Sequence, residues 1–189
     1  MTGVLEDTNQ WYAVAKIAGL KMCAAYRRQY GCDFISAMPT NLYGTHDRFD
    51  EHVSHVIPAM MMKMHRAKTQ GAPSVTFWGT GAPLREFLYA DDLAQALIHL
   101  LKTYSAEKTV NVGSGEEVSM RVLADMMKEI TGYRGDVVWD ADKPDGTPRK
   151  ALDGSVLSAL GWRALVPLKE GLKRVYAWYQ QTESLRTAA

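Results

Sequence analysis

Apolar and polar positions along the chain alternate between the helical period and the strand period. The first helix is expected from about Asn9 to Tyr30, where apolar residues recur at i, i+3 and i+4 and Gly31 follows as a stop signal. A second helix is expected to be capped by Ser54, with Pro58 in its first turn and a methionine-rich face. A helix through Leu101 is expected to be capped by Asp91 or Asp92, and a helix to Thr131 by Ser119. Two more helices are expected near Ser155–Leu160 and over Leu168–Gln181.

Short apolar runs between these helices are typical of strands. They cover Cys32–Met38, closed by Pro39, and then Val75–Trp78, Arg85–Tyr89, Thr109–Val112 and Asp136–Trp139. The polar segment from Thr40 to Val53 follows neither period and is expected to be a loop, and long loops in compact domains often carry function. Helices that alternate with strands indicate an α/β domain.

The composition mainly excludes certain classes of protein and of binding partner. The 189 residues are 47% hydrophobic and 23% charged, which is typical of a globular domain. A balance of 22 basic against 21 acidic residues argues against a nucleic acid or a membrane surface as partner. The first residues lack the features of a signal peptide, so a cytoplasmic location is expected. Cys23 and Cys32 are expected to be buried free thiols.

Tyr12 and Lys16 form the most informative short motif. Their i, i+4 spacing places a phenol and an ammonium on one helix face. A nearby cation favours the phenolate, which helps a tyrosine to exchange a proton with a carbonyl oxygen as a ketone is reduced. Such pairs also occur by chance on helices without catalytic function.

Five further blocks follow this motif in order. The six are YAVAKIAG at 12–19, MPTNLYG at 38–44, SHVIPAM at 54–60, FWGTGAPLREFLYADD at 77–92, NVGSG at 111–115 and KPDGTPRK at 143–150. Together they resemble the extended short-chain dehydrogenase/reductase family, and within it the NADP-dependent epimerase-reductases that act on GDP-4-keto-6-deoxy-mannose. The resemblance implies a Rossmann-type α/β fold and an enzyme that forms a homodimer through the helix from Asn9 to Tyr30.

The resemblance also implies roles for single residues. Tyr12 would protonate the oxygen at sugar carbon 4, Lys16 would bind the nicotinamide ribose, and His55 would exchange protons at carbons 3 and 5. The NADP(H) site would be lined by Lys16, Pro39, Thr40, Asn41, Leu42 and His55. Contacts to the GDP-sugar substrate would come from Lys63, Trp78, Arg85 and Asp145.

Three of the four substrate residues also have a structural interpretation. Trp78 could belong to the core, Arg85 could form a surface ion pair with Glu86, and Asp145 could simply form an Asp-Gly turn. The GxG pairs at 79–81 and 113–115 are interpreted as turns. No metal is expected, because the histidines lack ligand spacing.

The chain contains no turn with three glycines at dinucleotide-binding spacing, and no serine or cysteine precedes Tyr12. We therefore expect the C-terminal part of the family fold, without its first βαβ units. Residues 1–55 would be the remnant of the Rossmann domain with the catalytic helix. Residues 56–189 would form mainly the smaller substrate-binding lobe, with 86–113 returning to the Rossmann part. Other interpretations stay open at this point: an epimerase or reductase for a different nucleotide sugar, a non-catalytic remnant, or half of a split enzyme.

The missing glycine-rich turn gives a first prediction. The 189 residues alone should bind NADPH weakly and should not complete epimerisation and reduction, because nothing in them lets backbone amides approach the pyrophosphate. A fluorescence titration with NADPH measures this, and a micromolar dissociation constant would refute it.

Overall fold

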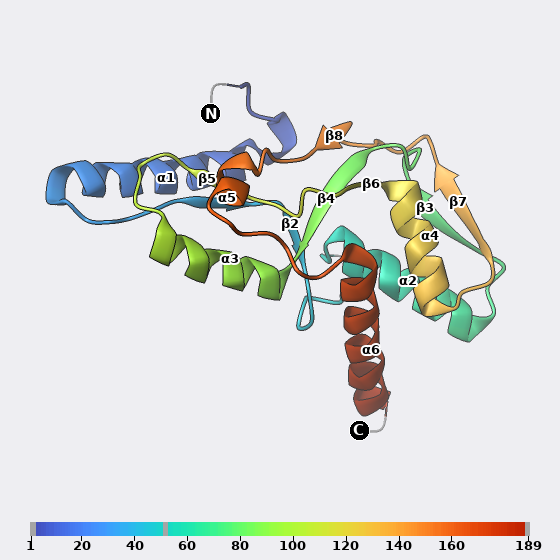
Figure 1. The fold of residues 1–189 in the computed structure, drawn as a ribbon. Helices are drawn as coiled ribbons and strands as arrows, with labels where there is room; N and C mark the ends of the chain where they lie inside the picture. The colour runs from blue at the N-terminus through green and yellow to red at the C-terminus, as the bar shows by residue number, and fades with distance from the viewer. Residues whose placement is uncertain (1–2, 51–52, 188–189) are drawn as a thin grey trace.

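The chain folds into helices and short, mostly parallel strands. Its computed structural model describes residues 3–50 and 53–187, and Figure 1 shows the arrangement. The helical elements are η1 (Asp7–Asn9), α1 (Gln10–Tyr30), α2 (Val56–Gln70), α3 (Ala90–Thr103), α4 (Met120–Thr131), α5 (Ser155–Ala159) and α6 (Leu168–Thr187). The strands are β1 (Ala37–Pro39), β2 (Asn41–Tyr43), β3 (Ser74–Trp78), β4 (Leu84–Tyr89), β5 (Val110–Val112), β6 (Glu117–Ser119), β7 (Asp136–Asp140) and β8 (Arg149–Lys150). The predicted α/β class is confirmed.

Strand β4 joins the largest set of strands. It pairs in parallel with β2 and β8 and antiparallel with β6, while β1 pairs in parallel with β5 and β3 with β7. Side chains alternate across β4, so that Phe87 and Tyr89 enter one core cluster and Leu88 enters another. The strand therefore links the two apolar cores of the molecule.

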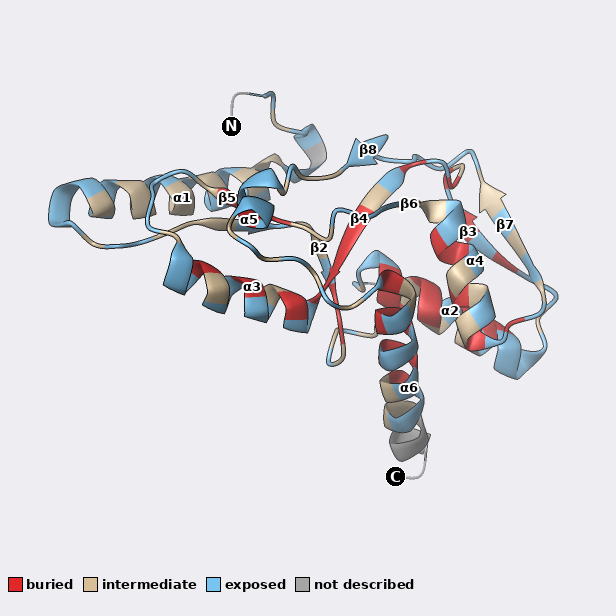
Figure 2. Cartoon of the chain, in the orientation of Figure 1, coloured by how far each residue is buried: buried red, intermediate tan, exposed pale blue. Residues whose placement is uncertain are grey.

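The two cores lie on either side of this strand, as the buried residues in Figure 2 show. The larger one packs α2, α4 and α6 against β3 and β4, with Met61, Met64 and Leu172 fully buried. The smaller one packs α3 and α5 against β5, around Leu100 and Val112. The predicted methionine-rich core face of α2 is confirmed. The predicted division into two domains stays a prediction.

Helix α1 follows its predicted limits but buries none of its residues. It ends at Gly31, whose φ of 69° suits glycine. Its last turn is tied to the segment after α3, because Arg27 donates to the carbonyl oxygen of Ser105 at 2.8 Å and Arg28 pairs with Glu107. In Figure 2 the helix is coloured intermediate or exposed along its length.

Two sequence predictions about the following segment are wrong in part. The strand expected over residues 32–38 is limited to Ala37–Pro39, because its partner β5 begins only at Val110 and no described strand lies beside residues 32–36. The loop expected over residues 40–53 contains strand β2, whose backbone pairs with β4. The short strands β6 and β8 were not predicted, and α6 continues beyond Gln181.

Of the three N-cap predictions, one is confirmed and two are wrong. Ser119 caps α4 as predicted, with its hydroxyl accepting from the amide of Val122 at 3.2 Å. Ser54 does not cap α2, because its hydroxyl bonds the loop before the helix. Asp92 does not cap α3, whose first residue is Ala90; its buried carboxylate accepts from the amides of the chain entering α6.

Two smaller expectations concern the turns and the thiols. Gly79 and Gly81 both have positive φ, which confirms the turn between β3 and β4. Cys23 and Cys32 are free, as expected, but only half-buried. Within the part of the chain that the structure describes, no helix is both long and apolar enough to cross a bilayer.

The confirmed cap gives a prediction of stability. Replacing Ser119 by Ala should lower the free energy of unfolding by about 1 kcal/mol, because the amide of Val122 loses its acceptor. Ser119→Thr keeps the hydroxyl and is the matched control. Urea denaturation measures both variants, and an equal loss in the two would show that the cap is not the cause.

Candidate functional site: a cavity between α2 and the strand ends

A cavity of about 490 Å³ lies where α2 faces β3, β4 and β7. Apolar side chains form much of its wall, including Met60, Phe77, Phe87, Met120 and Trp139. The polar and charged lining comes from Asn41, Ser54, Lys63, Arg85 and Asp145, with Trp78 beside them. A mostly apolar cavity with a few converging polar groups is typical of a small-molecule site. All four residues predicted to contact substrate line it, and so does Asn41.

Arg85 and Asp145 place opposite charges in the cavity. Burial lowers the pKa of the Arg85 guanidinium, and attraction to Asp145 opposes that shift. The Arg85 guanidinium donates to the carbonyl oxygen of Leu84 at 2.8 Å. The pKa of the Asp145 carboxyl is lowered mainly by the Thr80 hydroxyl and then by the Thr80 amide, both of which donate to it. Both groups can therefore stay charged at neutral pH and face a polar ligand.

Lys63 reaches the cavity from α2, and Trp78 from the end of β3. The ammonium of Lys63 donates to the carbonyl oxygen of Thr76 at 3.1 Å and lies 5.7 Å from the centroid of the Phe77 ring. Trp78 is 68% exposed although it lines the cavity, so its interpretation as a core residue is wrong. An exposed indole at a cavity mouth can stack on a planar ligand group.

Glu86 is the polar residue that the sequence did not single out. Its side chain is 1% exposed and accepts from the amides of Gly115 at 2.8 Å and Leu152 at 3.0 Å. A Cβ atom at Gly113 would lie 2.1 Å from Glu86 Oε1, so only glycine fits beside the carboxylate. The ion pair considered between Arg85 and Glu86 is therefore wrong, because Glu86 points into the core.

The backbone of Glu86 also holds two of the residues predicted to bind the cofactor. Its carbonyl oxygen accepts from Thr40 Oγ1 at 3.1 Å and from Asn41 Nδ2 at 2.8 Å. Asn41 reaches the cavity, whereas Thr40 does not line it. Pro39 and Leu42, which are exposed, do not line it either.

Tyr12 and Lys16 lie together on α1, as their spacing predicts. The Lys16 ammonium is 5.2 Å from the centroid of the Tyr12 ring, and Tyr12 is 61% exposed. This arrangement presents the pair to solvent rather than to the core. Neither residue lines the cavity, and their catalytic roles stay predictions.

His55 lies at the rim of the cavity, at the N-terminal end of α2. Its neighbours Ser54 and Val56 line the cavity, and its own side chain is 83% exposed. His55 Nδ1 lies 3.9 Å from Asp47 Oδ1, so a carboxylate faces one ring nitrogen. Asp47 carries no signal in the sequence beyond its place in the loop. The other ring nitrogen of His55 can face a ligand.

The described residues contain no group of three or more His, Cys, Asp or Glu side chains placed to hold a metal ion. His46 instead packs against Trp178, with ring centroids 4.9 Å apart. It does so with a φ of 66°, which is uncommon for a residue other than glycine.

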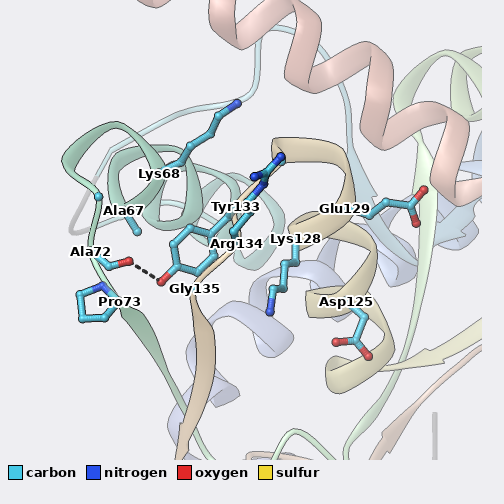
Figure 3. Close-up of a pocket in the computed structure, with 12 residues that line it drawn as sticks. Ala67, Lys68, Ala72, Pro73, Asp125, Lys128, Glu129, Tyr133, Arg134 and Gly135 are labelled. Carbon is cyan, nitrogen blue, oxygen red and sulfur yellow. Dashed lines mark hydrogen bonds between the residues drawn. The ribbon is translucent and has the colours of Figure 1, made fainter.

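A second, larger cavity of about 1150 Å³ lies at the C-terminal ends of α2 and α4 (Figure 3). None of the predicted site residues lines it. Lys68 donates there to the carbonyl oxygen of Thr131, and the Tyr133 hydroxyl donates to that of Ala72. Lysines beside helix C-termini balance the partial negative charge of the last carbonyls. The position of Lys68 is explained by this contact with the end of α4.

Comparison with known proteins shows the family of the chain. The family model described as "NAD dependent epimerase/dehydratase family" matches residues 1–113. The chain is 58% identical over 179 residues to "Probable GDP-L-fucose synthase 1" of Oryza sativa subsp. japonica, covering 95% of this chain and 55% of that protein. It is 47% identical to "GDP-L-fucose synthase" of Escherichia coli (strain K12), covering 97% of this chain and 60% of that protein.

Solved structures show the same similarity. A GDP-L-fucose synthetase from Naegleria fowleri bound to NADP superposes with a TM-score of 0.89 at 28% identity, covering 96% of this chain and 59% of that one. A GDP-6-OMe-4-keto-L-xylo-heptose reductase from C. jejuni gives the same TM-score at 33% identity, covering 96% and 64%. The chain thus spans a little over half the length of the curated relatives it matches.

The buried carboxylate gives a prediction. Glu86→Gln should lower the free energy of unfolding by about 1–3 kcal/mol, because an amide NH₂ would face a backbone amide that needs an acceptor. Glu116→Gln changes an exposed carboxylate next to Gly115 and should alter the free energy of unfolding by less than about 0.5 kcal/mol. Chemical denaturation measures both, and equal stability of the two variants would contradict the assignment.

Proposed function

The chain belongs to the NAD dependent epimerase/dehydratase family, and on this premise we propose that it carries the catalytic helix and the substrate-binding part of a GDP-L-fucose synthase. Such an enzyme is an NADP-dependent epimerase-reductase that converts GDP-4-keto-6-deoxy-mannose to GDP-L-fucose. One observation supports this most: Lys63, Trp78, Arg85 and Asp145 come from four separate parts of the chain, namely α2, β3, β4 and the segment before β8, and line one cavity.

The cavity suits the GDP portion of the substrate. The Arg85 guanidinium can donate two hydrogen bonds to phosphate oxygens, and Lys63 adds a second cation. Trp78 offers a planar face, and Asp145 offers acceptors to the donors of a guanine or a ribose. Two placed cations are enough for a diphosphate, so the chain needs no basic surface.

In our proposal the catalytic residues are not among those that line this cavity. Tyr12 gives a proton to the oxygen at carbon 4, with Lys16 beside its ring to favour the phenolate that results. His55 takes and returns protons at carbons 3 and 5, where the neighbouring keto group makes them acidic. A histidine suits this work because its charge changes near neutral pH.

The residues present suit only one end of NADP(H). In the proposal the nicotinamide side contacts Asn41 and Thr40, whose side chains are held by the carbonyl oxygen of Glu86. The cofactor, when bound, supplies the hydride. The 189 residues offer no glycine-rich turn for its pyrophosphate, so no residue of this chain is assigned to that group.

A homodimer formed through α1 and a cytoplasmic location are further parts of the proposal. The helix exposes large apolar side chains that a partner could cover: Trp11, Val14, Met22, Tyr26 and Tyr30. Such a surface favours association over solvent exposure. Sedimentation of the chain at several concentrations tests the dimer.

Substitution of Arg85 tests the proposed function. Arg85→Ala should weaken binding of GDP to the 189-residue chain by about 10- to 100-fold, because a hydrogen bond to a charged group contributes roughly 1.5–3 kcal/mol. Arg134→Ala removes a cation from the larger cavity and is the matched control. Isothermal titration calorimetry measures all three proteins. A chain that binds no GDP, or that loses binding only with Arg134→Ala, would overturn the proposal.

A further inference from the structure

We propose that Thr80 is a positioning residue for nucleotide binding, acting through Asp145. Its two donor groups hold the Asp145 carboxylate, and with it the segment 141–148, at the cavity. This inference rests on the proposed function, because it concerns how the same cavity presents Asp145 to the GDP portion of the substrate.

The contacts between the two residues are specific. The Thr80 amide donates to Asp145 Oδ1 at 2.6 Å, and the Thr80 hydroxyl donates to Asp145 Oδ2 at 2.7 Å. The same hydroxyl oxygen accepts from the amide of Ala82 at 3.1 Å, which fixes its rotamer. Thr80 thus donates to both oxygens of a carboxylate that lies 65 positions later in the chain. The backbone of Gly81 also contributes a hydrogen bond to this carboxylate. A carboxylate has about four acceptor positions in total, so acceptor capacity remains for a ligand.

The turn that carries Thr80 is shaped around this contact. Gly79 has a φ of 79°, and a Cβ atom there would lie 2.2 Å from Asp145 Oδ1. Gly81 has a φ of 75°, and a Cβ atom there would lie 2.6 Å from Arg121 Cγ. Any other residue at 79 would push the carboxylate away, and any other residue at 81 would displace the arginine that packs on Trp139. Both glycines are needed for close approach as well as for the backbone angle.

The segment that Asp145 belongs to has few other ties. Residues 141–148 are exposed throughout and belong to no helix or strand. At one end the amide of Lys143 donates to Asp140, and at the other the amide of Leu84 donates to the carbonyl oxygen of Pro148. Between these ends, the side-chain hydrogen bonds of the described segment are those of the Asp145 carboxylate, which accepts from the Thr80 amide and hydroxyl and also from the backbone of Gly81. The position of the segment at the cavity therefore depends on the 79–81 turn, and Thr80 is the residue of that turn whose side chain takes part.

The charges in the cavity agree with this role. Asp145 faces the Arg85 guanidinium, and each attracts the other. If Thr80 released Asp145, its carboxylate would be free to move onto Arg85, which would then be neutralised toward a diphosphate. Thr80 thus keeps Asp145 and Arg85 apart as two separate binding groups.

Three variants test this. Thr80→Val removes the hydroxyl donor with little change in shape and should weaken GDP binding by about tenfold, the loss of one hydrogen bond to a charged group. Thr80→Ser keeps the donor and should bind GDP within about twofold of the unchanged chain. In an Asp145→Ala background, Thr80→Val should have no further effect on GDP binding, because the residue acts through Asp145.

Titration calorimetry of the 189-residue chain with GDP measures these constants, and thermal unfolding shows whether each variant stays folded. Tight GDP binding by Thr80→Val would overturn the inference and leave the proposed function intact. So would a tenfold loss that persists in the Asp145→Ala background, which would reveal a general structural role. Failure of the unchanged chain to bind GDP would overturn the proposed function, and this inference with it.

Discussion

One buried carboxylate connects the parts of this molecule that lie far apart in sequence. Glu86 is held in the middle of β4, where its side chain accepts from two loop amides and its carbonyl oxygen accepts from Thr40 and Asn41. A buried polar group costs free energy unless its hydrogen bonds are satisfied, so these loops must close around it. The cavity forms beside the same strand. Its walls are therefore placed by a polar contact as much as by apolar packing.

The cavity shows how a site can be built from turns once the strands are fixed. Strand β3 ends at Trp78, the Gly79–Gly81 turn follows, and β4 then brings Arg85 to the same space. The segment before β8 returns Asp145 to that turn from much later in the chain. Trp78 and Arg85 lie in strands, and Asp145 lies in the segment before β8. The precision of the site comes from the hydrogen bonds between the turn and this segment.

Local signals in the sequence were enough for much of the fold. The limits of α1 and α4 followed from periodicity, from Gly31 and from the Ser119 cap, all of which act within a few residues. Ser54 carries the same capping signal, but its hydroxyl finds partners in the preceding loop. Residues 32–36 look like a strand, yet strand formation depends on a neighbour that no local pattern contains.

The site, like the fold, is predicted by the sequence only in part. The residues of the cavity could be named from short blocks, but their meeting in one space depends on tertiary structure. Glu86 was paired with Arg85 because the two are adjacent, although neighbours in a strand point to opposite faces. The partner of Asp145 could not be predicted, because Thr80 belongs to a turn whose residues are common in any loop. Long-range hydrogen bonds of this kind leave no periodic trace.

Helix α1 is separate from the apolar core that holds the cavity. It carries Tyr12 and Lys16, buries no residue, and is fastened by ion pairs and hydrogen bonds of its last turn to the segment after α3. The cavity belongs instead to elements with a shared apolar core. Opening of the helix therefore does not require opening of the cavity, because protection from local unfolding follows buried contacts. A surface that covers α1 would therefore bury Tyr12 and Lys16 without adding to the apolar core that holds the cavity.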